Sequence, residues 1–159
     1  TYIRTLIRDL GRLSGNECEL LELHRSRSGS LTDQMACTMQ QLADAVFLWT
    51  AHEDPRALTR LLAPVETILD DIPQITIKDG AVAALSHGAP LARPGVVSIP
   101  KGLPSGSTVL LSSLKGEAVA IAETSVGADT IPGMENGQIA TPRTGIMQPG
   151  AYPQTWSKE

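Results

Sequence analysis

The stretch IKDGAVAALSHGAPLARPGV, residues Ile77–Val96, contains the start and end signals of a short helix. Asp79 is a residue type that caps helix N-termini, and Gly88 is the type that ends helices. The pattern predicts a two-turn helix at Gly80–His87. The run QITI (74–77) directly before it has the β-branched content and alternation of a strand.

Further strands are predicted on the C-terminal side of this helix. They fall in GVVSI (95–99), STVLLSS (107–113), EAVAIAET (117–124) and GQIATPRTGIM (137–147). Lys115-Gly116 has the composition of a hairpin turn between the second and third of these runs. The sequence therefore predicts a small, mostly β barrel of about 75 residues with one short helix.

Helical spacing dominates the N-terminal side. Apolar residues recur at the period of a helix near the start of the chain: Ile3, Leu6, Ile7, Leu10 and Leu13. Arginines recur every four residues on another face of that helix: Arg4, Arg8 and Arg12. We expect Gly11 and the Ser-Gly-Asn cluster at 14–16 to end the helix. The alternation in Cys18–Gly29 then predicts a strand.

Two more helices are expected before the barrel. Thr38 and Gln41 form a capping-box pattern ahead of a helix at Met39–Thr50. The face expected to be buried comprises Met39, Leu42, Ala43, Val46 and Phe47. Asp54 and Pro55 predict the N-cap and first position of a helix that runs to Leu62. A change of composition after Asp70–Pro73 predicts two domains, residues 1–72 and 73–159, and an α+β fold class.

Charge is unevenly distributed along the chain. The 159 residues carry a net charge of -4 at pH 7, and the acidic excess lies between residues 28 and 72. This balance argues against a protein that coats nucleic acid by bulk charge. The two cysteines, Cys18 and Cys37, lack zinc-site spacing and imply no disulfide framework. We expect no metal and a cytoplasmic location, or a nucleolar one in a eukaryote.

Several separated motifs, in order, resemble one family. TYIRTLIRDLG (1–11) with LLELHRSRSG (20–29) is similar to the segment that closes the active site of the TruB/dyskerin family of RNA pseudouridine synthases. The stretch Ile77–Val96 resembles the opening of the PUA RNA-binding domain in the dyskerin branch. LKGEAVAIAE (114–123) and MQPGAYPQTW (147–156) match that branch as well.

The resemblance implies the end of a catalytic domain followed by a PUA barrel. The family isomerises uridine to pseudouridine in rRNA or tRNA with an aspartate nucleophile and no cofactor. None of the aspartates here has the sequence context of that nucleophile, so we expect it upstream and expect this chain alone to be inactive. The resemblance also favours the archaeal or eukaryotic branch, which is guided by box H/ACA RNA.

By resemblance, three residues belong to the catalytic pocket. Arg4 would pair with the nucleophilic carboxylate, Tyr2 would line the pocket, and Leu23 would pack against the extruded base. Without the motif, the arginines fit a solvated helix face, and Tyr2 and Leu23 fit core positions. His24 stands where the family usually has arginine, which puts a phosphate role there in doubt.

The barrel carries the expected RNA contacts. The residues carried over from the family's PUA domain are Lys78, Asp79, Ala81, Val82, Leu85, Gly88, Ala89 and Leu91, with Arg143 as a phosphate contact and Tyr152 in a segment that seals the barrel. For Ala81, Val82 and Leu85 the alternative is simple packing of the helix. With few basic residues, recognition by shape and hydrogen bonds is expected.

The expected partners are a box H/ACA guide RNA, the rRNA or tRNA substrate and the small proteins of the H/ACA particle, with no membrane and no DNA. A stand-alone enzyme acting on tRNA is the alternative within the same chemistry. A non-catalytic PUA RNA-binding module is another, and a protein-interaction domain without RNA is a third.

Overall fold

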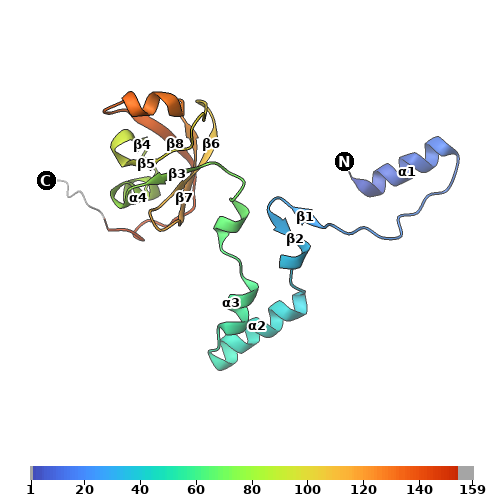
Figure 1. Cartoon of the computed structure of the whole chain (residues 1–159). Helices are drawn as coiled ribbons and strands as arrows, with labels where there is room; N and C mark the ends of the chain where they lie inside the picture. Colours follow the sequence, from blue (N-terminus) through green and yellow to red (C-terminus); the bar gives the residue numbers. More distant parts are fainter. Residues whose placement is uncertain (1, 154–159) are drawn as a thin grey trace. The chain divides into compact units, whose positions relative to one another are not determined.

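The computed structural model describes residues 2–153 of the chain and divides it into two compact units, Thr1–Ala36 and Cys37–Glu159. The elements of the first unit are α1 (Ile3–Ser14), β1 (Arg27–Ser28), β2 (Leu31–Thr32) and the 3-10 helix η1 (Asp33–Met35). The second unit begins with α2 (Met39–His52), α3 (Arg56–Leu61) and the 3-10 helix η2 (Val65–Ile68). Figure 1 labels the α-helices and the strands among these elements along the chain.

The first helix is confirmed, but it continues past Gly11 to Ser14. Gly15 ends it in the left-handed conformation, with φ of 70°, and donates its backbone N–H to the Gly11 carbonyl. Gly11 is buried, and a Cβ there would lie 2.9 Å from the carbonyl oxygen of Asn16. Gly11 is therefore required for the chain to fold back closely, and it does not terminate the helix.

The strand expected over Cys18–Gly29 is wrong for most of its length. Only Arg27 and Ser28 pair, in a short antiparallel hairpin with Leu31 and Thr32. The preceding residues are extended without a partner strand in the described part of the chain, and Leu21 is 90% exposed. Alternating apolar and polar residues are compatible with a strand, but a strand in a sheet also needs a neighbouring strand for its backbone hydrogen bonds.

The capping box of α2 is confirmed. Thr38 Oγ1 accepts from the Gln41 backbone N–H at 3.1 Å, and Gln41 Oε1 accepts from the Thr38 N–H at 2.8 Å. The predicted burial of its apolar face is wrong, because Phe47 is 60% and Met39 80% exposed. The short helix α3 is the element that α2 packs against, and Ala45 is the residue of α2 that becomes buried.

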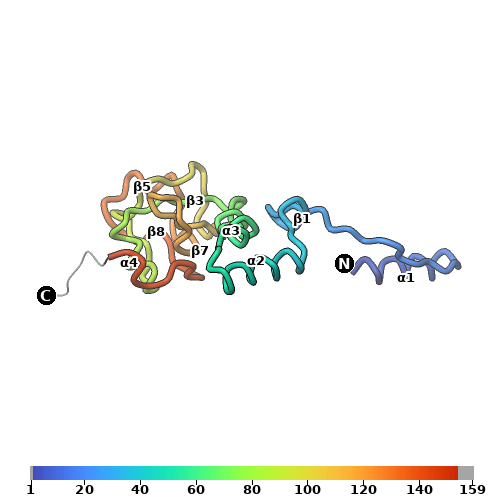
Figure 2. The backbone as a smooth tube through the Cα atoms, turned by 90° about the horizontal axis from the view of Figure 1, so that it is seen from below, coloured from blue at the N-terminus to red at the C-terminus, as the bar shows by residue number. Residues whose placement is uncertain are grey.

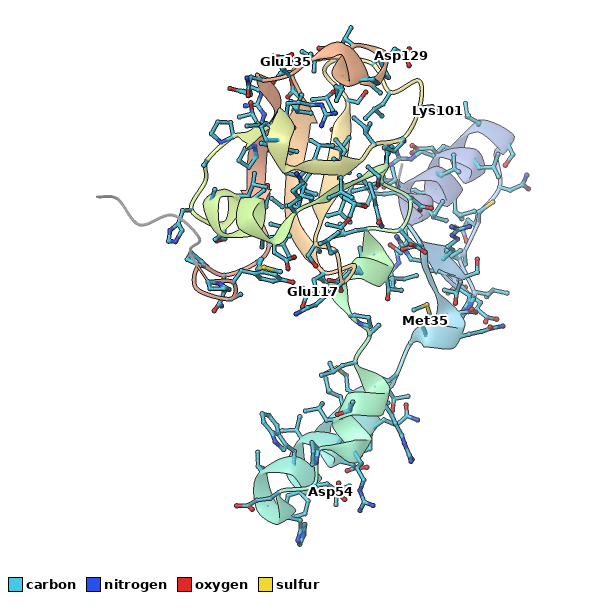
Figure 3. The ribbon with its side chains drawn as sticks, turned by 60° about the vertical axis from the view of Figure 1, so that its left-hand side comes forward. Met35, Asp54, Lys101, Glu117, Asp129 and Glu135 are labelled. Carbon is cyan, nitrogen blue, oxygen red and sulfur yellow. The ribbon has the colours of Figure 1, made fainter. Side chains whose placement is uncertain are left out.

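The next helix, α3, begins at Arg56. Asp54 lies in the turn between α2 and α3 (Figure 3). Its carboxylate accepts from the Arg56 backbone N–H at 3.1 Å and from the guanidinium at 2.7 Å. The hydrogen bonds from Arg56 lower the pKa of Asp54 to about 2.

The rest of the second unit is a curled six-stranded sheet with α4, called the barrel below (Figures 1 and 2). Its elements are β3 (Gln74–Ile77), α4 (Asp79–Ser86), β4 (Leu91–Ala92), η3 (Arg93–Gly95), β5 (Val96–Ser98), β6 (Thr108–Ser112), β7 (Ala118–Thr124), η4 (Ala128–Gly133) and β8 (Gln138–Gly145). The strand order is β4-β8-β7-β6-β3-β5, with β3 parallel to β6 and the other pairs antiparallel. The strands predicted for the barrel and the α+β class are confirmed.

Alternation along the strands builds the core. Val109 and Leu111 of β6 face the interior cluster, and they are fully buried. Leu110 between them faces the other side of the sheet, where Leu69 and Ala118 cover it. The segment after α3 is also tied to the sheet, because Glu66 Oε1 accepts from the Ala118 N–H at 2.8 Å.

Candidate nucleic-acid interface

A mostly apolar groove of about 360 Å³ lies between α4 and the β4–η3 segment. Its lining comprises Lys78, Gly80, Ala81, Ala84 and Leu85 on one side, and Pro90, Leu91, Ala92, Pro94 and Gly95 on the other. Four of the predicted RNA contacts therefore meet in one groove: Lys78, Ala81, Leu85 and Leu91. Lys78 is the cation among the lining residues, and small side chains keep the rest of the groove open.

Backbone contacts hold the two walls of the groove together. The Lys78 N–H donates to the Gly95 carbonyl at 2.8 Å. A Cβ on Gly95 would lie 2.8 Å from the Ala81 Cβ and 3.2 Å from Leu91 Cδ1. Glycine is therefore needed at this position for η3 to approach α4 this closely.

The ends of α4 differ in part from the prediction. Asp79 was expected as the N-cap, but the helix begins at Asp79, and Lys78 occupies the N-cap position without a side-chain capping bond. Asp79 therefore lies in the first turn, where a negative charge is favourable with the helix dipole. Gly88 ends the helix as predicted. Its φ of 86° is in the left-handed region, and its backbone N–H donates a hydrogen bond to the Leu85 carbonyl.

Burial separates the predicted contacts into two groups. Val82 is fully buried in the core cluster, so its side chain packs the barrel, which was the alternative role for it. Leu85 and Leu91 are also more than nine-tenths buried and form the floor of the groove. Gly88 is exposed and Ala89 half-buried, and neither is among the groove's lining residues.

A second pocket, of about 300 Å³, lies beside the first turn of α4 and the β6–β7 hairpin. Asp79, Lys115, Glu117 and Tyr152 line it, together with Met147, Ala151 and Pro153. Figure 3 shows Glu117 at this end of the barrel. Two further predicted contacts, Asp79 and Tyr152, thus come together here, although 73 positions separate them in sequence.

A polar network fixes the wall of this pocket. Glu117 Oε2 accepts from the Tyr152 hydroxyl at 2.5 Å and from Ser113 Oγ at 2.9 Å. Lys115 Nζ lies 5.3 Å from the centroid of the Tyr152 ring. The hydrogen bonds from Tyr152 and then Ser113 lower the pKa of Glu117, so this carboxylate remains ionised at neutral pH. Sequence reasoning found Tyr152 but missed Glu117, since nothing local connects the two.

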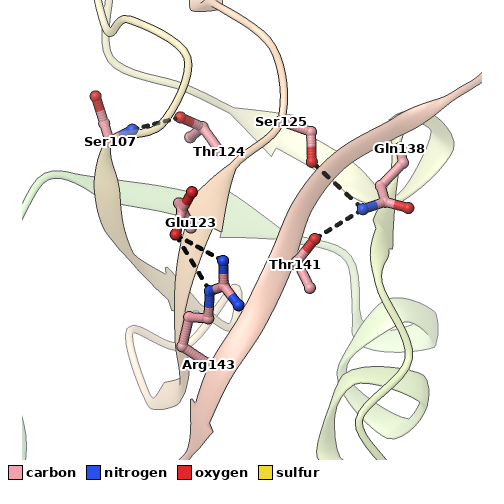
Figure 4. A network of polar contacts seen from close by, with 7 residues as sticks. All are labelled: Ser107, Glu123, Thr124, Ser125, Gln138, Thr141 and Arg143. Atoms are coloured by element: carbon pink, nitrogen blue, oxygen red, sulfur yellow. Dashed lines mark hydrogen bonds and ion pairs between the residues drawn. The ribbon is translucent and has the colours of Figure 1, made fainter.

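Tyr152 packs partly buried against the core cluster, in line with the expected sealing segment. The remainder of that segment, residues 154–156, lies outside the described residues. Arg143 lines neither cavity. It forms an ion pair with Glu123 at 2.9 Å on β7 and β8, next to the hydrogen bonds of Gln138 (Figure 4).

In the first unit, Leu23 shares a cavity of about 420 Å³ with Ile3, His24 and Arg25. Tyr2 is the N-cap of α1 and is 86% exposed, and Arg4 is exposed on that helix. Neither Tyr2 nor Arg4 is among the lining residues, so the three predicted catalytic residues do not form one pocket within this unit.

His24 has a role that the sequence did not predict. Its Nε2 lies 2.9 Å from Asp33 Oδ2, which ties the residue after Leu23 to η1. The hydrogen bond from His24 lowers the pKa of Asp33.

No helix within residues 2–153 is long and apolar enough to cross a membrane. Over the same residues, the His, Cys, Asp and Glu side chains form no group of three that could hold a metal ion.

The curled sheet, with one short helix beside a groove of small residues, has the architecture of a PUA domain, and residues 73–146 match that family. Residues 4–70 match the family of tRNA pseudouridylate synthase B C-terminal domains. The chain belongs to the TruB/dyskerin family of RNA pseudouridine synthases, as the resemblance of its motifs predicted.

Relatives and solved structures agree with this assignment. The probable tRNA pseudouridine synthase B of Pyrobaculum aerophilum is 35% identical over 159 residues, which cover 100% of this chain and 48% of the relative. That of Methanosarcina barkeri is 36% identical, with 100% and 47% covered.

Two structural matches are chains of an H/ACA RNP and of a complex of H/ACA sRNP proteins. A chain of an H/ACA RNP bound to a substrate RNA containing 2'-deoxyuridine matches with a TM-score of 0.86 and 31% identity, covering 98% of this chain and 50% of that one. A chain of the archaeal box H/ACA sRNP Nop10-Cbf5 complex matches with a TM-score of 0.85 and 32% identity, again covering 98% and 50%. The chain thus spans about half the length of the relatives that it matches.

Proposed function

We propose that this chain is the RNA-binding and pocket-closing part of an enzyme that isomerises uridine to pseudouridine in RNA. The groove between α4 and η3 would hold the single-stranded end of an RNA. The observation that carries the proposal is the convergence of Lys78, Ala81, Leu85 and Leu91 on one apolar groove. A single cation with an apolar floor suits an unstacked nucleotide, because the floor receives the base and the cation contacts a phosphate.

In the parent protein, the first unit would close the catalytic pocket. Arg4 would pair with the nucleophilic carboxylate, and Tyr2 and Leu23 would contact the target base, as the resemblance implies. The exposure of Tyr2 and Leu23 leaves both available for such contacts. We propose that the nucleophile lies upstream and that this chain alone produces no pseudouridine.

The bound RNA is proposed to be a box H/ACA guide RNA, with Nop10- and Gar1-like proteins as further partners. Support comes from matches to chains of an H/ACA RNP, of a Nop10-Cbf5 complex and of a Cbf5-Nop10-Gar1 complex. A stand-alone enzyme acting on tRNA remains the alternative, and the names of the two relatives above favour it. The domain limits 1–72 and 73–159, the absence of a cofactor and the cytoplasmic location remain predictions.

The test is binding of this chain to a hairpin RNA that ends in single-stranded ACA, compared with the same hairpin ending in UGU, at one fixed salt concentration. Ala84→Leu fills the groove with a larger side chain, and we expect at least about tenfold weaker binding. Ala51→Leu is the matched control, since Ala51 is exposed on α2. This variant should bind like the parent chain.

Preference for ACA that is lost in Ala84→Leu would support the guide-RNA function. Equal binding of both hairpins would favour the tRNA-type enzyme or a general RNA-binding module. No binding of either hairpin by the folded chain would overturn the proposal.

A further inference from the structure

The β1–β2 hairpin brings η1 beside the segment that carries Leu23. The hairpin turns the chain back, so Ser26, directly before β1, lies beside Asp33, the residue directly after β2. The Asp33 backbone N–H donates to the Ser26 carbonyl at 3.0 Å. The Asp33 carboxylate oxygen Oδ2 lies 2.9 Å from His24 Nε2. Asp33 therefore holds the end of this segment at two points, one on the backbone and one on a side chain.

The position of Leu23 depends on such anchors. Residues 17–26 lie outside the helices and strands, and Leu23 is 60% exposed. A planar peptide unit joins Leu23 to His24, so an anchor at His24 restricts where the Leu23 backbone can lie. Ordering a free backbone costs conformational entropy. A leucine that is held in place before its partner arrives therefore binds that partner better than one that must first be ordered.

The charged groups near His24 act in opposite directions. The hydrogen bond from His24 lowers the pKa of Asp33, so that carboxylate remains ionised at neutral pH. Arg25 lines the cavity that His24 and Leu23 share, and Ile3 of α1 supplies an apolar wall there. Arg25 has the same sign of charge as a protonated imidazole. The Asp33 carboxylate is in hydrogen-bond contact with the ring, whereas the exposed Arg25 is screened by solvent, so the attraction exceeds the repulsion.

We propose that His24 and Asp33 form a positioning pair that holds Leu23 in place for its contact with the target base. The inference rests on the proposed function, because the base contact of Leu23 is implied by the resemblance. His24 is a positioning residue, since it acts through Leu23. It stands where the family usually has arginine, so a permanent charge is replaced by one that changes between about pH 5 and 8. The pair should hold Leu23 most firmly at the acidic end of that range.

The first measurement is made on this chain and needs no RNA. Backbone ¹⁵N relaxation gives the order parameter of the Leu23 amide in the chain, in Asp33→Ala and in Asp44→Ala. Asp44 is the matched control, because it is an exposed aspartate on α2 that accepts a side-chain hydrogen bond, from Gln40 Nε2 at 2.7 Å. At about pH 6, we expect the order parameter to fall in Asp33→Ala from about 0.8 to about 0.6 or below, and to be unchanged in Asp44→Ala.

The variant His24→Arg tests the contribution of the charge. Arginine keeps its charge throughout the neutral range, so the Leu23 amide should remain ordered between about pH 6 and 8 in this variant. In the chain itself, the order parameter should decline over the same range as the imidazole loses its charge. A residue that only filled space would give the same pH dependence in both proteins.

The second measurement tests whether the pair acts through Leu23. The parent enzyme, with a guide RNA and the Nop10- and Gar1-like proteins, is assayed by release of tritium from C5 of the target uridine in a labelled substrate RNA. Because both side chains of the pair are exposed, Asp33→Ala should lower kcat/KM by only about threefold. In a Leu23→Ala background the same change should have less than about a 1.5-fold effect, since the positioned side chain is already missing.

The inference is overturned if Leu23 is as ordered in Asp33→Ala as in the chain, or if His24→Arg loses order with rising pH as the chain does. It is equally overturned if Asp33→Ala leaves activity unchanged, or lowers it by the same factor with and without Leu23. If the parent enzyme forms no pseudouridine, the proposed function fails, and the relaxation measurement still decides whether the pair holds Leu23. The two failures are therefore distinguishable.

Discussion

Replacing Gly95 by alanine would add a methyl group where η3 comes closest to α4. The new Cβ would lie 2.8 Å from the Ala81 Cβ and 3.2 Å from Leu91 Cδ1. Carbon atoms pack at about 3.5–4.0 Å, so the two walls would have to separate by several tenths of an ångström. The Lys78–Gly95 hydrogen bond, at 2.8 Å, resists that separation.

Overpacking of this kind costs about 1–3 kcal/mol, and we expect about 2 kcal/mol for Gly95→Ala. In a folded region of about 80 residues, this corresponds to a fall in Tm of roughly 8–16 °C. Differential scanning calorimetry or a circular dichroism melt of the chain measures the shift.

Gly145→Ala is the matched control. A Cβ on Gly145 meets nothing within 4 Å, and its φ is not in the left-handed region. Alanine there should leave Tm unchanged or raise it slightly, because it restricts the unfolded chain. If Gly95→Ala melts at the same temperature as Gly145→Ala or above it, the close approach of η3 to α4 is refuted.

Four further outcomes are expected. Thr38→Ala should lower the stability of α2 by about 1 kcal/mol through loss of the capping box, seen as faster amide exchange in its first turn. Ile77→Ala should destabilise the barrel by about 2–5 kcal/mol in urea unfolding, whereas Leu114→Ala, at a 57% exposed position, should cost under about 0.5 kcal/mol. The pKa of Glu117 is lowered in the folded state, so the ionised carboxylate stabilises the fold at pH values above 4.5, the ordinary pKa of a glutamate. This stabilisation is lost as pH falls through the lowered pKa. The melting temperatures of the chain and of Glu117→Gln should therefore converge towards low pH. Lys78→Gln should weaken RNA binding and reduce the slope of log affinity against log salt by about one, and an unchanged slope would remove Lys78 from the phosphate contacts.

Local signals in the sequence predicted most of the barrel. The structure contains three features as predicted: a strand in the β-branched run before Lys78, a helix end at Gly88 and a turn at Lys115-Gly116. Such features can be predicted because each depends on residues within a few positions of one another. The Thr38–Gln41 capping box was predictable for the same reason.

Features that depend on distant partners were predicted less well. The alternating residues before β1 have no neighbouring strand in the described chain, and within that part α3 is the element against which α2 mainly packs. Periodicity shows which side chains would share a face, but it does not show whether anything covers that face. Exposure of Phe47 and Met39 is therefore a result that only the structure supplies.

The sequence by itself determined the family, the order of the helices and of most strands of the barrel, and four of the residues that line the groove. The tertiary structure decided their roles. In the structure, Val82 is buried in the core. Lys78 and Asp79 are neighbours in sequence but line two different cavities. The tertiary structure also brought Tyr152 to Glu117 across 35 positions. Hydrogen bonds and burial act through space, so residue type and spacing identify candidates, and only the folded chain determines which of them meet.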